Sequence, residues 1–131
     1  MRARPTALAV ASALLLAACG DGGSPTRVEL TMHYSAFSPR TLTVPRGVPV
    51  TLVLRNDDPI AHEWIVGDDS VHERHRTGTE PVHGERPTEL TVPGLAERTT
   101  VVTFERPGDY RFVCHLPGHE SYGMTGVLRV V

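Results

Sequence analysis

From residue 27 to residue 131 the sequence is a succession of short segments that favour β-strands, each ended by residues that favour turns. In RVELTMHY every second side chain is apolar, which predicts a strand with one buried face formed by Val28, Leu30, Met32 and Tyr34. Seven further segments have a similar character: TLTV, VPVTLVLRN, HEWIV, TELTV, RTTVVTF, DYRFVC and GVLRVV. About eight short strands with frequent turns predict an all-β sandwich of two sheets.

One polar segment, residues 68–86, interrupts the strands with DDSVHERHRTGTEPVHGER. Its part DSVHERHR is long enough for two helical turns, with Asp69 or Ser70 as the N-cap. We therefore expect a partly helical insertion on the surface. Three interpretations of its histidines, His72, His75 and His83, stay open: a solvated polar loop, an accessory site for Cu(II) or Zn, or a lid.

The start of the chain predicts an export signal. Two arginines precede an apolar run over residues 7–18 that is short for a membrane span. Small residues stand directly before Cys19, which resembles the lipobox of bacterial lipoproteins, whose cysteine is lipidated. We expect a signal peptide (1–18), a lipid-anchored tether (19–26) and a domain (27–131) outside the cytoplasm, on the outer face of the cell membrane or in the periplasm. An ordinary signal peptide with an incidental cysteine is the alternative.

The charge of the chain bears on its partners. Without Arg2 and Arg4, the 13 basic residues become 11 against 15 acidic ones, so the mature protein is acidic. An acidic balance argues against nucleic acid as a partner. The length suits a single domain, and we expect a monomer.

The chain has two cysteines, and lipidation of Cys19 would leave Cys114 without a disulfide partner. In CHLPGHESYGM, Cys114 shares the loop between the last two predicted strands with His119 and Met124. Thiolate and imidazole suit zinc, copper or iron–sulfur, whereas a thioether favours copper. The fourth donor is expected to be His62, because a strand that starts there can begin at the same end of the sandwich.

These segments resemble the cupredoxins, of the plastocyanin, azurin and auracyanin kind. CHLPGHESYGM matches the C-terminal Cys–His–Met signature of that family, and VTLVLRNDDPIAH matches the segment around its upstream histidine. The resemblance covers nearly all of residues 27–131 and implies a Greek-key sandwich with one copper ion (Cu+/Cu2+). It makes His62, Cys114 and His119 the equatorial ligands and Met124 the axial one. Many cupredoxins have Asn where this chain has Glu63, and that Asn helps to tie the two ligand loops together near the cysteine sulfur.

The expected function is electron transfer, since four protein donors leave no open position for a substrate, which argues against an enzyme. By resemblance, electrons pass through His119 to a redox partner protein. From their position in the two ligand loops, we expect Pro59, Ile60, Leu116 and Pro117 to form an apolar docking rim around it. The alternative is a copper-sequestering or copper-delivery lipoprotein, which the histidines of the insertion favour. A hydrolase built on Cys114 and a histidine is a third class, without a visible oxyanion loop.

Other side chains near these motifs receive structural interpretations. Alternation along the strand predicts that His115 points away from Cys114 and is solvated. We expect His33 to be structural and Trp64 to lie in the core near the metal end. Tyr122 either covers the site or fills the loop.

Overall fold

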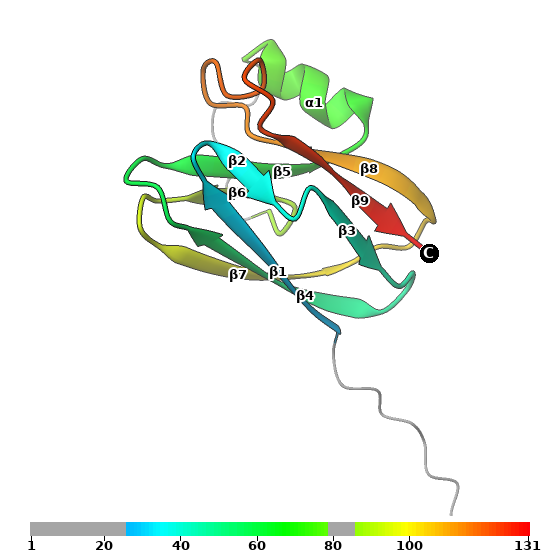
Figure 1. Cartoon of the computed structure of the whole chain (residues 1–131). Coiled ribbons are helices and arrows are strands. Elements are labelled where there is room, and N and C mark those ends of the chain that lie inside the picture. The colour runs from blue at the N-terminus through cyan, green and yellow to red at the C-terminus, as the bar shows by residue number, and fades with distance from the viewer. Residues whose placement is uncertain (1–25, 79–85) are drawn as a thin grey trace, which may run out of the picture.

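The computed structural model describes residues 26–78 and 86–131 (Figure 1). The predictions for residues 1–18, Cys19, the tether up to residue 25 and His83 lie outside these ranges. The described residues form one helix and nine strands: β1 (Thr26–His33), β2 (Ala36–Ser38), β3 (Thr41–Val44), β4 (Pro49–Asn56), β5 (His62–Gly67), α1 (Asp69–Arg76), β6 (Glu89–Val92), β7 (Glu97–Thr103), β8 (Gly108–Val113) and β9 (Thr125–Val130).

The strands form two facing sheets (Figure 1). One has the order β2-β1-β4-β7 and the other the order β3-β9-β8-β5-β6. The chain crosses between the sheets after β2, β3, β4, β6 and β7, as in Greek-key sandwiches. The predicted all-β sandwich is therefore confirmed.

The core lies between the sheets and is built by the predicted alternation. Leu30 and Met32 of β1 are buried beside Leu52 and Leu54 of β4, while residues between them in β1 are more exposed. Trp64 is fully buried, as expected. Each such side chain contributes about 1.5–3 kcal/mol to stability through burial.

The predicted end of the first strand is wrong. Tyr34 is 85% exposed instead of buried, because β1 ends at His33. Tyr34 and Ser35 both have positive φ angles, of 52° and 53°, and turn the chain tightly into β2. The three-residue strand β2, which pairs with β1, was not predicted.

The predicted helix is confirmed as α1, but its N-cap is Asp68 and not Asp69 or Ser70. Asp68 Oδ1 accepts hydrogen bonds from the backbone N–H groups of Ser70 (3.0 Å) and Val71 (3.2 Å). Gly67 lets the helix pack closely on β5, since a Cβ there would lie 2.6 Å from Val71 Cγ2. The helix folds back over the five-stranded sheet, and its C-terminal turn lies beside the β8–β9 loop (Figure 1).

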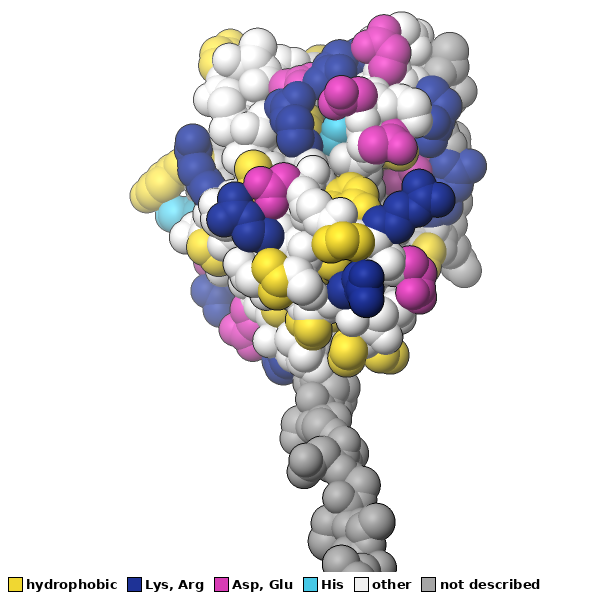
Figure 2. Space-filling model, turned by 90° about the vertical axis from the view of Figure 1, so that its right-hand side faces the viewer, with side chains coloured by type: hydrophobic (Ala, Val, Ile, Leu, Met, Phe, Trp, Pro, Cys, Tyr) yellow, Lys and Arg dark blue, Asp and Glu magenta, His cyan; other side chains and the backbone are white. Residues whose placement is uncertain are grey.

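Figure 2 shows the side of the molecule that is on the right in Figure 1. Side chains of both charges are interspersed there, with apolar side chains between them. Within the described ranges, no helix has the length and apolar character needed to cross a membrane.

Candidate metal centre

Three of the predicted donors meet at one end of the sandwich. His62 begins β5 and Cys114 directly follows β8, and these neighbouring strands pair antiparallel, with Ile65 opposite Val113. His119 comes from the β8–β9 loop. The distances are 3.2 Å from His62 Nδ1 to His119 Nδ1 and 3.3 Å from Cys114 Sγ to His119 Nδ1. All three donor atoms lie within 4.8 Å of one another, as expected for ligands of one ion.

Met124 closes the loop that carries two of these donors. Its N–H donates to the carbonyl of His119 (3.0 Å), and its own carbonyl accepts from the N–H of Cys114 (3.1 Å). Its side chain is fully buried. These backbone bonds fix the base of the loop, and they hold the thioether residue directly beside the thiol and imidazole residues.

Asp58 is part of the site, although the sequence suggested only a turn for NDDP. Its Oδ2 lies 2.8 Å from His62 Nε2, and both side chains are buried. Burial would raise the pKa of Asp58, but hydrogen bonds from Ser35, His62 and Tyr34 outweigh it and hold the pKa below its usual value. An ionised Asp58 accepts the Nε2 hydrogen of His62. The lone pair of His62 is then on Nδ1, the ring nitrogen that faces the other candidate metal ligands.

Asn56 braces the two loops beside His62. Its side-chain Nδ2 donates to three carbonyls, those of Ile60 (2.7 Å), Val92 (3.1 Å) and Pro93 (3.0 Å). Its Oδ1 accepts from the N–H of Asp58 (3.0 Å). The buried amide therefore ties the β4–β5 loop to the β6–β7 turn.

Glu63 stands where many cupredoxins have Asn, but a contact between this residue and the cysteine is present. The backbone N–H of Glu63 donates to Cys114 Sγ at 3.3 Å, which a change of side chain leaves in place. A hydrogen bond of this kind stabilises the thiolate, and it links β5 to the thiol that directly follows β8.

Burial acts on two of the donors, Cys114 and His119. Burial raises the pKa of the Cys114 thiol to about 11. Burial, and then the neighbouring His62, lower the pKa of His119. A thiol and two imidazoles with a buried thioether residue beside them fit copper, because soft sulfur with nitrogen ligands suits that ion.

The second set of histidines is buried, so the prediction that His115 is solvated is wrong. Its side chain is 4% exposed, and its Nε2 lies 3.0 Å from Nδ1 of His72, which is 1% exposed. The alternation used for the prediction stops at Val113, where β8 ends, and His72 and His75 of α1 lie against His115. The ring of His75 stacks on His115 at 5.2 Å. A solvated loop is therefore the wrong interpretation for His72 and His75.

The remaining predictions have mixed outcomes. His33 is half-exposed, with Nδ1 at 3.4 Å from Asp58 Oδ1, a contact that fits a structural role. Tyr122 is exposed and lies against Gly118, so it does not fill the loop. Within the part of the chain that the structure describes, the three-donor group is His62, Cys114 and His119, and neither His72 nor His75 belongs to such a group.

Comparison with known proteins supports a copper site of this type. A family model described as a cupredoxin-like domain matches residues 6–130. The chain is similar to the copper-resistant cuproprotein CopI of Rubrivivax gelatinosus, with 33% identity over 94 residues. That match covers 69% of this chain and 56% of the relative, so the chain spans little more than half of that protein.

Auracyanin-A of Chloroflexus aurantiacus is 29% identical over 147 aligned positions, which cover 91% of each chain. The crystal structure of dithionite-reduced auracyanin from Roseiflexus castenholzii superposes with a TM-score of 0.68 at 23% identity. That superposition covers 83% of this chain and 99% of the other, and it supports the same fold.

Proposed function

The chain belongs to the cupredoxin-like family, and on that premise we propose that it is an electron carrier with one copper ion held by His62, Cys114, His119 and Met124. The observation that carries the proposal is the convergence of two imidazole nitrogens and one thiol sulfur within 4.8 Å in a buried position. Bound copper would supply a one-electron couple between Cu(I) and Cu(II).

The residues around the donors favour fast electron transfer, because they keep the ligands in place. Asp58 orients His62, and the N–H of Glu63 holds the sulfur of Cys114. The backbone bonds of Met124 fix the loop of His119. A ligand set that cannot rearrange lowers the cost of changing the oxidation state. With four protein donors there is no open position for a substrate, so the proposed role is not enzymatic.

A docking surface for the redox partner forms part of the proposal. Exposed apolar side chains gather on the loops around the donors, and we call the following set the apolar rim: Tyr34, Ile60, Leu95 and Tyr122. The N–H groups of Tyr34 and Leu95 both donate to Asp58, and that of Tyr122 donates to the carbonyl of Gly118. Clustered apolar exposure of this kind favours transient protein contacts near His119.

The predicted rim residues differ in their exposure. Ile60 is 49% exposed, and Pro59 and Pro117 are also exposed. Leu116 is partly buried and packs against the core. Ile60 is therefore the better residue for a test of docking.

We also propose that the protein lies outside the cytoplasm and carries a lipid on Cys19. The sequence pattern of residues 1–19 supports this part of the proposal. Fractionation of cells that express the full chain tests it. The protein is expected with the membranes, and the Cys19→Ala variant is expected to leave them. Equal membrane association of both forms would contradict the lipid anchor.

Copper sequestration is the second candidate function. The name of the Rubrivivax gelatinosus relative, copper-resistant cuproprotein, favours it. Cyclic voltammetry of the copper-loaded protein distinguishes the two functions. A fast, reversible one-electron wave supports the carrier, whereas tight Cu(I) binding without a reversible wave supports sequestration.

A further inference from the structure

Two buried imidazoles outside the centre face each other without a role in it. His72 projects from α1, and His115 is the second residue after β8, next to Cys114. The distance from His72 Nδ1 to His115 Nε2 is 3.0 Å. Two nitrogens bound to one ion at 2.0–2.1 Å are about 2.9 Å apart at a right angle and about 3.3 Å apart at a tetrahedral angle. The observed separation lies between these values.

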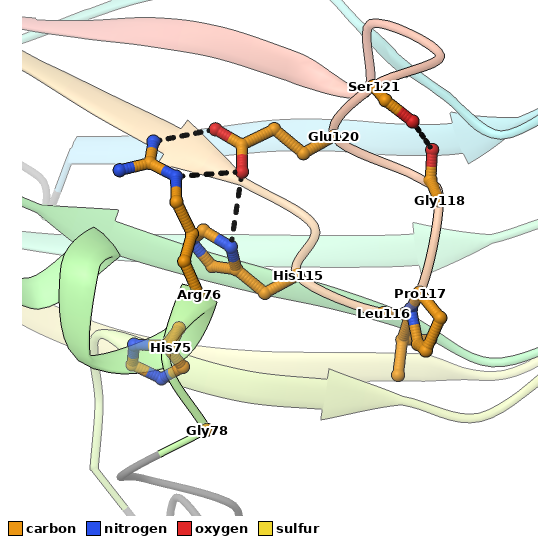
Figure 3. Close-up of a pocket in the computed structure, with 9 residues that line it drawn as sticks. All are labelled: His75, Arg76, Gly78, His115, Leu116, Pro117, Gly118, Glu120 and Ser121. Atoms are coloured by element: carbon orange, nitrogen blue, oxygen red, sulfur yellow. Dashed lines mark hydrogen bonds and ion pairs between the residues drawn. The ribbon is translucent and has the colours of Figure 1, made fainter.

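The outward-facing nitrogen of each ring points toward an oxygen atom. His72 Nε2 lies 3.2 Å from the carbonyl oxygen of Arg111. His115 Nδ1 lies 3.6 Å from Glu120 Oε2, and Arg76 holds that carboxylate with two further contacts (Figure 3). Metal-bound imidazoles usually donate their remote N–H to a carbonyl or a carboxylate. The pair repeats the arrangement that His62 and Asp58 show in the main centre.

The inner nitrogens of the two rings are placed to share one cation. A carbonyl only accepts, so His72 carries its hydrogen on Nε2 and has a bare lone pair on Nδ1. That lone pair faces Nε2 of His115 at 3.0 Å. A cation between the rings would accept one lone pair from each ring, with the outward nitrogen of His72 on the carbonyl of Arg111 and that of His115 facing the carboxylate of Glu120.

We propose that His72 and His115 hold a second metal ion, a divalent cation of the Cu(II) or Zn(II) class. Imidazole nitrogen suits both ions. His75 is not counted as a ligand, because its Nδ1 donates to the carbonyl of Val71 at 2.7 Å and its Nε2 lies 3.7 Å from Glu89. It stacks on His115 and supports that ring from one side.

Water completes the coordination of this ion. A pocket of about 630 Å³ opens beside His115 (Figure 3) and is lined by His75, Arg76, Gly78, His115, Leu116, Pro117, Gly118, Glu120 and Ser121. It gives solvent and the ion a route to the pair. The second site is independent of the proposed electron transfer, and it can be measured with or without it.

The test adds one equivalent of Zn(II) to the copper-loaded protein at pH 7.5 and measures bound zinc after dialysis. We expect one zinc per chain, with the visible absorption of the main centre unchanged. The His72→Gln and His115→Gln variants are each expected to bind zinc at least about tenfold more weakly. His75→Gln is the matched control, a buried histidine of the same helix, and is expected to bind zinc as the unmodified protein does.

NMR of the ring nitrogens gives a readout that needs no variant. Zinc is expected to shift His72 Nδ1 and His115 Nε2 and to leave the ring nitrogens of His75 nearly unchanged. A parallel experiment adds Cu(II) in place of zinc to the copper-loaded protein. The added Cu(II) is expected to give an EPR spectrum of nitrogen-bound copper without a second intense visible absorption band. Failure of the protein to bind zinc, or loss of zinc only in His75→Gln, would overturn the proposal and leave the main centre unaffected.

Discussion

The Nε2 atom of His62 lies 2.8 Å from Oδ2 of Asp58, a carboxylate that is itself buried and held by the N–H groups of Tyr34 and Ser35. This contact places a negative charge directly behind a candidate copper ligand. A charge at that position stabilises the more positive oxidation state, and it makes the His62 ring a stronger donor.

Replacing Asp58 with Asn should therefore raise the copper reduction potential, by roughly 50 mV, the equivalent of about 1 kcal/mol for a one-electron couple. Spectroelectrochemistry of the copper-loaded protein measures this shift. Asp57→Asn is the matched control, since Asp57 is the neighbouring carboxylate and pairs with Arg55 at the surface. A lower potential for Asp58→Asn, or equal shifts in both variants, would contradict the role of Asp58.

Asn56 should be important for stability because its amide serves three carbonyls at once. Asn56→Ala leaves those acceptors without their donor, and we expect a loss of about 3 kcal/mol in the free energy of unfolding. Urea denaturation of the metal-free protein measures this loss. Asn56→Asp keeps the shape but not the donors, so it should be at least as unstable, while Thr99→Ala on the exposed face of β7 should change little. A stable Asn56→Asp protein would show that the donor role is wrong.

The sequence predicted the strands well where one side of a strand faces the core, as in β1 and β4, because burial enforces the alternation. It missed β2, since the positive φ angles of Tyr34 and Ser35 that lead into it are not specified by any local residue preference. It placed His62, Cys114 and His119 at one end of the sandwich through the position of His62 at the start of a strand and the resemblance to the cupredoxins. It missed Asp58, which acts through a contact that depends on how the NDDP turn folds onto β5.

The burial of His72 and His115 was also beyond sequence reasoning. Polar residues such as DSVHERHR predict a solvated helix, and nothing local indicates which side faces the protein. That choice depends on the close contact between Gly67 and Val71, which sets how α1 lies on the sheet. The helix then covers His115, a residue beyond the end of β8 to which strand alternation no longer applies.

Copper binding should release a proton from the thiol. Because the pKa of Cys114 is raised to about 11, the sulfur is protonated at pH 8, and it must lose this hydrogen to become a ligand. We expect roughly one proton per Cu(I) at pH 8, and an apparent affinity that rises about tenfold per pH unit from neutral pH up to the thiol pKa. A titration in weakly buffered solution with a pH electrode measures the release. Binding at pH 8 without release would mean that the thiol is already ionised.

The apolar rim should control exchange with the redox partner. Ile60→Glu places a charge on an exposed apolar position next to the donors, and it should slow electron exchange at least about tenfold through weaker docking. Val101→Glu is the matched control. Val101 is an exposed apolar residue of β7 in the four-stranded sheet, where it lies opposite Thr51 of β4. Stopped-flow spectroscopy measures the rate of electron transfer from each reduced variant to a small redox protein that oxidises cupredoxins. Equal rates in the two variants would remove the docking surface from the proposal.

The visible absorption spectrum of the Cu(II)-loaded protein tests the central claim most directly, namely that His62, Cys114 and His119 bind one copper ion together. An intense band toward the red end of the spectrum is expected at one copper per chain, and it should be lost in Cys114→Ser and strongly altered in His62→Ala. A colourless copper-loaded protein, or an identical band in the His62→Ala variant, would contradict the account.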